Sequence, residues 1–130
     1  SYKVNLAQIL VIDLKDTLFC TSEEMLWAYE KTLYFKDCFA ALLWFGDIKF
    51  SQLRRLQLAA EAGRTWGVLF RPFNNINQTS PSPLRIKVSR YATRKRGSSA
   101  EEYSNIGYEV AVLRAGGNCT GKSCYILGDA

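Results

Sequence analysis

The composition of this chain points to one globular domain and excludes several other classes of protein. Nearly half of its 130 residues (48%) are apolar, which is enough for a hydrophobic core, and its formal net charge is +5. The sequence contains neither an apolar run of about 18 residues for a membrane span nor a basic and then apolar stretch of the signal-peptide type. We therefore expect one soluble, cytoplasmic domain over residues 1–130.

The first predicted elements are a buried strand and a helix. The run "ILVIDL" (Ile9–Leu14) is continuously apolar, as in strands that are covered on both faces of a sheet. A helix capped by Thr21 or Ser22 should follow it, because acidic residues fill its first turn. Its apolar residues recur at helical spacing and form one stripe: Met25, Leu26, Tyr29 and Leu33.

A second strand, a second helix and a third strand come next. "FAALLWF" (Phe39–Phe45) and "GVLFRP" (Gly67–Pro72) are apolar runs of strand length. Between them, "SQLRRLQLAAEAG" (Ser51–Gly63) predicts a helix that ends at Gly63, with Leu53, Leu56 and Ala60 facing inward. The order β-α-β-α-β with short connections predicts a parallel sheet with helices packed against it.

The character of the sequence changes after this core. A polar, turn-rich loop covers residues 74–83, and "LRIKVSR" (Leu84–Arg90) then alternates apolar and polar residues as a half-exposed strand does. "YEVAVLR" (Tyr108–Arg114) and "CYIL" (Cys124–Leu127) predict two further strands. The fold class that follows is α/β, a parallel β-α-β-α-β core extended at its C-terminal end by an antiparallel β-meander.

The segment "GGNCTGKS" matches the phosphate-binding pattern G-x-x-x-x-G-K-[ST] through Gly116, Gly121, Lys122 and Ser123. A working phosphate loop opens directly into a helix, whereas only "CYILGDA" follows here, and these residues favour a strand. We therefore interpret the segment as a hairpin turn, in which Gly116 and Gly117 permit positive φ and Lys122 is exposed. Neither a cofactor nor a metal is predicted.

Two other features have functional interpretations. Asp47 ends an apolar strand as the magnesium-binding acid of an ATPase does, but Gly-Asp after a strand is also ordinary turn chemistry, which we favour. The basic residues near the predicted meander are candidates for contact with nucleic acid or an acidic surface, or they form a solvated loop: Lys87, Arg90, Arg94, Lys95 and Arg96.

The cysteine and histidine content removes several kinds of catalytic site. The four cysteines, Cys20, Cys38, Cys119 and Cys124, form no C-x-x-C pair, and the chain has no histidine to complete a mixed zinc site. Reduced, structural thiols are the interpretation that fits a cytoplasmic chain. Without histidine the commonest general base is also missing, so we expect a protein that is not an enzyme.

The stretch from Glu23 to Pro72, followed by "SPSPLRIKV" and "VLRAGGNCTGK", resembles the SulA/ImuA group of bacterial DNA-damage-response proteins. The most specific part is "LRRLQLAAEAG" (Leu53–Gly63) and the strand after it that ends in "FRP". The resemblance covers nearly the whole chain. It implies a RecA-like, three-layer fold that has lost its ATPase machinery and acts by binding other proteins, with part of the natural N-terminus missing.

Two branches of this group imply different partners. ImuA-type proteins accompany ImuB, RecA and a DnaE-type polymerase in translesion DNA synthesis, and the helix sequence looks closest to them. SulA-type proteins bind FtsZ and block its polymerisation, which inhibits cell division; this alternative stays open, as does a homodimer. A P-loop nucleotidase that uses Lys122, Ser123 and Asp47 is the third hypothesis.

The residues expected at a protein interface are exposed cations and aromatic residues outside the strand interiors. Tryptophan and arginine anchor interfaces more often than other residues do. Adjacent arginines on one helix cannot both face the core, so at least one points outward. The candidates are Phe50, Arg54, Arg55, Trp66 and Phe73. A solvated helix face is the structural alternative for the two arginines.

Overall fold

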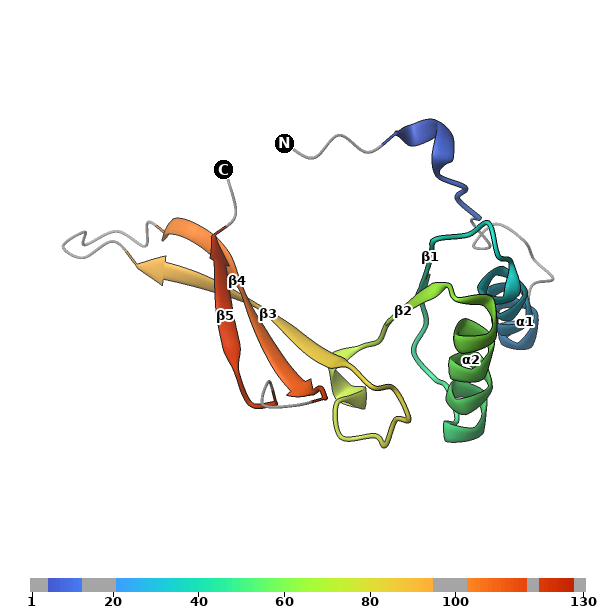
Figure 1. The fold of residues 1–130 in the computed structure, drawn as a ribbon. Helices are drawn as coiled ribbons and strands as arrows, with labels where there is room; N and C mark the ends of the chain where they lie inside the picture. Colours follow the sequence, from blue (N-terminus) through green and yellow to red (C-terminus); the bar gives the residue numbers. More distant parts are fainter. Residues whose placement is uncertain (1–4, 13–20, 95–102, 117–119, 128–130) are drawn as a thin grey trace.

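The computed structural model describes residues 5–12, 21–94, 103–116 and 120–127 (Figure 1). A short 3₁₀ turn, η1 (Leu6–Gln8), comes first and is followed by helix α1 (Ser22–Tyr34). The remaining elements, in chain order, are β1 (Ala40–Trp44), α2 (Phe50–Gly63), β2 (Trp66–Phe70), the 3₁₀ turn η2 (Phe73–Asn75), β3 (Arg85–Arg94), β4 (Tyr103–Arg114) and β5 (Ser123–Leu127).

Helix α1 begins where its capping residues predict. The Glu24 N–H donates to the Thr21 hydroxyl over 3.3 Å, and the Thr21 N–H donates to the Glu24 carboxylate over 2.7 Å. This reciprocal capping box satisfies two N–H groups that a helix terminus otherwise leaves unpaired. Leu26, Tyr29 and Leu33 are buried as predicted, whereas Met25, the fourth residue of the predicted stripe, is only half-buried.

Strands β1 and β2 are parallel, and helix α2 connects them. The register pairs Ala40 with Trp66 and Trp44 with Phe70. The helix buries Leu53, Leu56 and Ala59, and these residues join the stripe of α1 in one core with Ala41 and Ile48. Both helices lie on the same side of the two strands in Figure 1, so the described residues form two layers rather than the three expected.

The end of α2 corrects one prediction. Arg64, not Gly63, has the left-handed conformation that ends the helix, with φ 56°. Gly63 lies in the last turn and is buried, and a Cβ there would sit 1.9 Å from the Leu33 carbonyl oxygen. The glycine is therefore needed for the close approach of α2 to the end of α1, and not for the helix stop.

The C-terminal strands form the predicted antiparallel meander in the order β3-β4-β5. Both β3 and β4 are longer than the sequence pattern indicated, since they continue to Arg94 and begin at Tyr103. In Figure 1 the meander extends away from the helical layer, and residues 71–84 connect it to β2. The coarse expectation of an α/β fold with a C-terminal meander is confirmed.

The predicted strand Ile9–Leu14 is wrong for its four described residues. Ile9, Leu10, Val11 and Ile12 are in no strand, and all four are exposed, Leu10 by 85%. A short apolar run forms a buried strand only where the edge of a sheet is available to pair with it. The spacing of apolar residues does not show whether such an edge is available. The described parallel sheet is therefore β-α-β, with α1 packed beside it.

Candidate protein-binding site

The face of the parallel sheet opposite the helices is apolar and open. Residues alternate along a strand, so Ala41, Leu43 and Leu69 point to the core and their neighbours point the other way. The outward residues define the apolar sheet face: Leu42, Trp44, Trp66, Val68 and Phe70. Trp44 is 69% exposed and Trp66 64% exposed. The Trp44 and Phe70 rings stack across the strands, with centroids 4.7 Å apart and planes 10° from parallel.

Strands that are apolar on both sides are typical of parallel sheets covered on both faces. Here the helices cover one face, where Gly67 lets the Leu33 methyl groups and the Tyr29 hydroxyl approach β2 closely. No described helix covers the other face. Large exposed apolar patches mark interaction surfaces more often than scattered apolar residues do. The apolar sheet face is therefore the strongest candidate for protein binding among the described residues.

The five predicted interface residues do not form one surface. Only Trp66 belongs to the apolar sheet face. Phe50 is exposed at the first position of α2, and Phe73 is exposed in η2. On α2, Arg54 donates to Gln57 over 2.9 Å, and the Arg55 guanidinium lies 3.1 Å from the Glu30 carboxylate on α1.

The candidates chosen from the sequence omit the other members of the face, because these residues lie inside the predicted strands Phe39–Phe45 and Gly67–Pro72. The sequences "ALLW" and "WGVLF" could have indicated this face, because the side chains on both sides of each strand are apolar. One layer of helices covers only one of the two sides. Only the pairing of β1 with β2 shows that Trp44 and Phe70 meet on the uncovered side.

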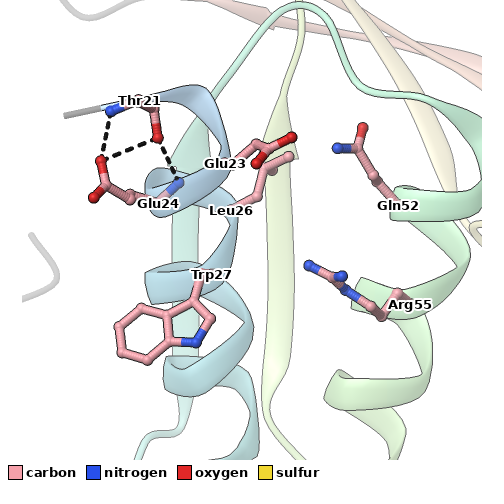
Figure 2. Close-up of a pocket in the computed structure, with 7 residues that line it drawn as sticks. All are labelled: Thr21, Glu23, Glu24, Leu26, Trp27, Gln52 and Arg55. Carbon is pink, nitrogen blue, oxygen red and sulfur yellow. Dashed lines mark hydrogen bonds between the residues drawn. The ribbon is translucent and has the colours of Figure 1, made fainter.

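A separate pocket of about 580 Å³ lies between α1 and α2 (Figure 2). Seven residues line it: Thr21, Glu23, Glu24, Leu26, Trp27, Gln52 and Arg55. Figure 2 shows Glu24 turned back onto Thr21 and the Arg55 guanidinium on α2 facing the space between the helices. The pocket therefore combines carboxylates, an indole and a guanidinium.

Several polar groups of this pocket have structural partners. The Thr21 N–H, which donates to the Glu24 carboxylate, and the Thr21 hydroxyl lower the pKa of Glu24. Arg55 pairs with Glu30, and the Lys31 ammonium lies 5.8 Å from the centre of the Trp27 ring. The Thr21 hydroxyl also donates to the Glu24 carboxylate over 3.0 Å, and this bond belongs to the group of bonds that caps α1.

The segment that matches the phosphate-binding pattern is part of a hairpin in its described residues. Ser123 begins strand β5, which runs antiparallel to β4. The Gly121 N–H donates to the Val112 carbonyl and the Val112 N–H donates to the Lys122 carbonyl, both over 2.8 Å. The positive φ of 83° belongs to Gly121 and not to Gly116 as expected; Gly117 lies outside the described residues. Lys122 is exposed, as predicted.

The basic residues are distributed over different surroundings. The Lys87 ammonium lies 5.0 Å from the centre of the Phe73 ring, and Arg90 is exposed on β3. Arg94 ends β3, while Lys95 and Arg96 lie outside the described residues. Burial, and after it the charge of Arg85, lower the pKa of Arg71. Asp47, which is exposed after β1, opposes this shift with its charge.

Cys38 and Cys124 are free thiols, and the other two cysteines lie outside the described residues. Within the described ranges, no cluster of three acidic, cysteine or histidine ligands is arranged to hold a metal ion. Likewise, no helix of that part of the chain has the length and apolar character to cross a bilayer.

In the comparisons with known proteins, no family model and no curated protein matches this chain.

Proposed function

We propose that this chain is a non-catalytic protein of the bacterial DNA-damage response that binds another protein through the apolar sheet face. The resemblance of its sequence to the SulA/ImuA group supports the biological setting, and the ImuA type is the first choice. In that role the chain is an accessory factor in translesion DNA synthesis, and its partner is ImuB, RecA or the associated polymerase. The finer architecture that we propose with this function is RecA-like.

The observation that supports the binding role is the exposure of the stacked pair Trp44 and Phe70 together with Trp66. Tryptophan residues at the centre of an apolar patch are the residues that most often contribute to binding energy at interfaces. A partner that covers this face would restore the double-sided burial that a parallel sheet usually has. The surface needs no reactive group to do so.

The alternative partner is FtsZ, as in the SulA type, and one pair of experiments separates the two branches. The purified chain is added to FtsZ, and GTP-dependent polymerisation is followed by light scattering. Suppression supports the SulA branch. No suppression, together with capture of purified ImuB or RecA in a pull-down, supports the ImuA branch.

The same assays test the surface. Trp44→Ser should weaken whichever binding is found by about tenfold or more, because a buried aromatic anchor commonly contributes more than about 1 kcal/mol. The matched control is Trp27→Ser on α1, where the tryptophan is 58% exposed but lies outside the apolar sheet face. Equal effects of the two substitutions would contradict the assignment of the site.

A further inference from the structure

The meander has a second apolar face that nothing in the described structure covers. Residues opposite one another on antiparallel strands share a face, and the register pairs Ile86 with Val112 and Val88 with Val110. On the next strand, Cys124 is opposite Val110, and Ile126 is opposite Tyr108. The meander face is thus defined by Ile86, Val88, Tyr108, Val110, Val112, Cys124 and Ile126.

The apolar face of this sheet is about as exposed as the opposite face, unlike the apolar face of an ordinary antiparallel sheet. Such sheets usually bury their apolar face and leave the polar face in water. Here Val88 is 60% exposed and Ile126 54% exposed, whereas Lys87 and Ser89, on the opposite face of β3, are half-buried. Arg90 is the charged residue of β3 on the apolar side, beyond Val88. The meander face therefore resembles half of a sheet-on-sheet interface.

Hydrogen bonds link the connection between the two sheets to both of them. The Asn75 side chain donates to the Gly46 carbonyl over 2.7 Å, which ties the loop to the end of β1. Arg85 on β3 donates to the Ile76 carbonyl and Arg114 on β4 donates to the Ser80 carbonyl, which ties the loop to the meander; Arg71 donates to Gln78 within the loop.

The areas of the two faces indicate how they are covered. On the apolar sheet face, Trp44 is 69% exposed, Trp66 64% and Phe70 42%. An aromatic side chain has roughly 150–250 Å² of surface, so these three residues expose about 350 Å² of apolar surface, and Leu42 raises the total to about 400 Å². An aliphatic side chain has roughly 60–120 Å² of surface, and the same estimate gives about 300 Å² of exposed apolar surface on the meander face.

Neither face paired with its own copy reaches the roughly 1,000 Å² in total that a specific interface needs. Both faces of one chain together present about 700 Å², within the range of roughly 600–1,000 Å² per partner for a standard interface. Two reciprocal contacts between two chains use both faces at once, and such a twofold arrangement closes on itself.

We propose that the chain forms a twofold dimer in which the apolar sheet face of each copy packs against the meander face of the other. In each contact the parallel sheet of one copy and the antiparallel sheet of the other stack at about the 10 Å spacing of packed sheets. The dimer occupies the surface that we assign to the protein partner. Self-association therefore competes with partner binding, but it does not depend on who that partner is.

The test uses two substitutions on different faces of the full chain, Trp66→Lys and Val88→Asp. Sedimentation velocity measures the dimer of the wild type and of each variant. We expect a dimer for the wild type and an increase in its Kd of about tenfold or more for each variant alone, since a buried unpaired charge costs about 1.4 kcal/mol or more. The decisive sample is a 1:1 mixture of the two variants.

In the reciprocal arrangement, the mixture restores a dimer. The mixed dimer contains one chain of each variant. In one contact both faces are wild type. In the other contact, the face with Trp66→Lys meets the face with Val88→Asp, so that opposite charges lie against each other. Pairing of like faces predicts instead that one of the two variants dimerises on its own as the wild type does, because its substitution lies on the face that is not used, and that the mixture rescues nothing. Trp27→Lys on α1 and Tyr125→Asp on the opposite side of the meander are the matched controls, with residues 58% and 64% exposed, and they should leave the dimer unchanged.

Circular dichroism confirms that each variant is folded before its association is measured, and a variant that does not fold is replaced by Trp66→Ser or Val88→Ser. A monomeric wild type at about 100 μM, a dimer insensitive to both substitutions, or the lack of rescue in the mixture would overturn the proposal. Failure of the FtsZ and ImuB experiments leaves these outcomes unaffected, so the two proposals fail separately.

Discussion

The Leu33 carbonyl oxygen occupies the position next to Gly63 where any other residue would place its Cβ. The distance from that oxygen to an ideal Cβ on Gly63 is 1.9 Å, and the Leu33 carbonyl carbon would lie only 2.9 Å away. Both neighbours are backbone atoms, which cannot rotate aside as a side chain does. The packing of α2 against α1 therefore depends on this glycine.

Gly63→Ala is expected to lower the free energy of unfolding by about 1–3 kcal/mol, because the two helices have to separate to admit the methyl group. Urea unfolding followed by circular dichroism measures the change. Gly116→Ala is the control, since a Cβ there has no atom within 4 Å. If the two alanine variants were equally stable relative to the wild type, the close approach of the helices would be wrong.

The Tyr29 hydroxyl connects α1 to both parallel strands, because it lies 3.2 Å from the Ala41 carbonyl on β1 and 3.2 Å from the Val68 carbonyl on β2. Burial raises the pKa of Tyr29 to about 12. The neutral form is favoured in the folded state, so this contribution to stability is complete below pH 10 and is lost as the pH rises toward 12. The two-unit difference corresponds to at most about 3 kcal/mol.

Tyr29→Phe tests this contribution. At pH 7 the variant should be less stable by about 1–2 kcal/mol, since two carbonyls lose their shared donor. The difference between the wild type and Tyr29→Phe should shrink between pH 10 and 12, because only the wild type has a hydroxyl to ionise there. Denaturant unfolding at pH 7, 10 and 11.5 measures it, and a constant difference would contradict the raised pKa.

The capping box of Thr21 and Glu24 starts the helix that carries Tyr29. Thr21→Ala removes the acceptor for the Glu24 N–H and should destabilise the protein by about 1 kcal/mol. Thr21→Ser keeps the hydroxyl and should be nearly neutral, which makes it the matched control in thermal unfolding. Equal loss in both variants would show that the threonine methyl group, and not the cap, is responsible.

The hairpin interpretation of the segment around Lys122 predicts that ATP does not bind there. Ser123 begins a strand, and no helix N-terminus follows it in the described residues to hold a phosphate. Titration of the wild type and Lys122→Ala with a fluorescent ATP analogue and Mg²⁺ should give no saturable binding in either. Binding by the wild type that Lys122→Ala abolishes would favour the nucleotidase hypothesis instead.

The predictions that succeeded rest on local chemistry. The cap at Thr21, the helical spacing of Leu26, Tyr29 and Leu33, and the alternation in β3 each depend on neighbours within a few residues. The predictions that failed needed a distant partner. Ile9–Ile12 have the composition of a buried strand but no paired edge, and Gly63 has a neighbour 30 positions away that decides its role.

The sequence by itself determined that β1 and β2 are apolar on both sides and that β3 alternates, because these patterns follow from the order of the residues. Only the tertiary structure decided which sides are covered. The helices pack on one face of the parallel sheet, and the described meander extends away from the helical layer without covering the other face (Figure 1). The burial of a strand face depends on which element packs against it, and the residue pattern of one strand does not show which element that is.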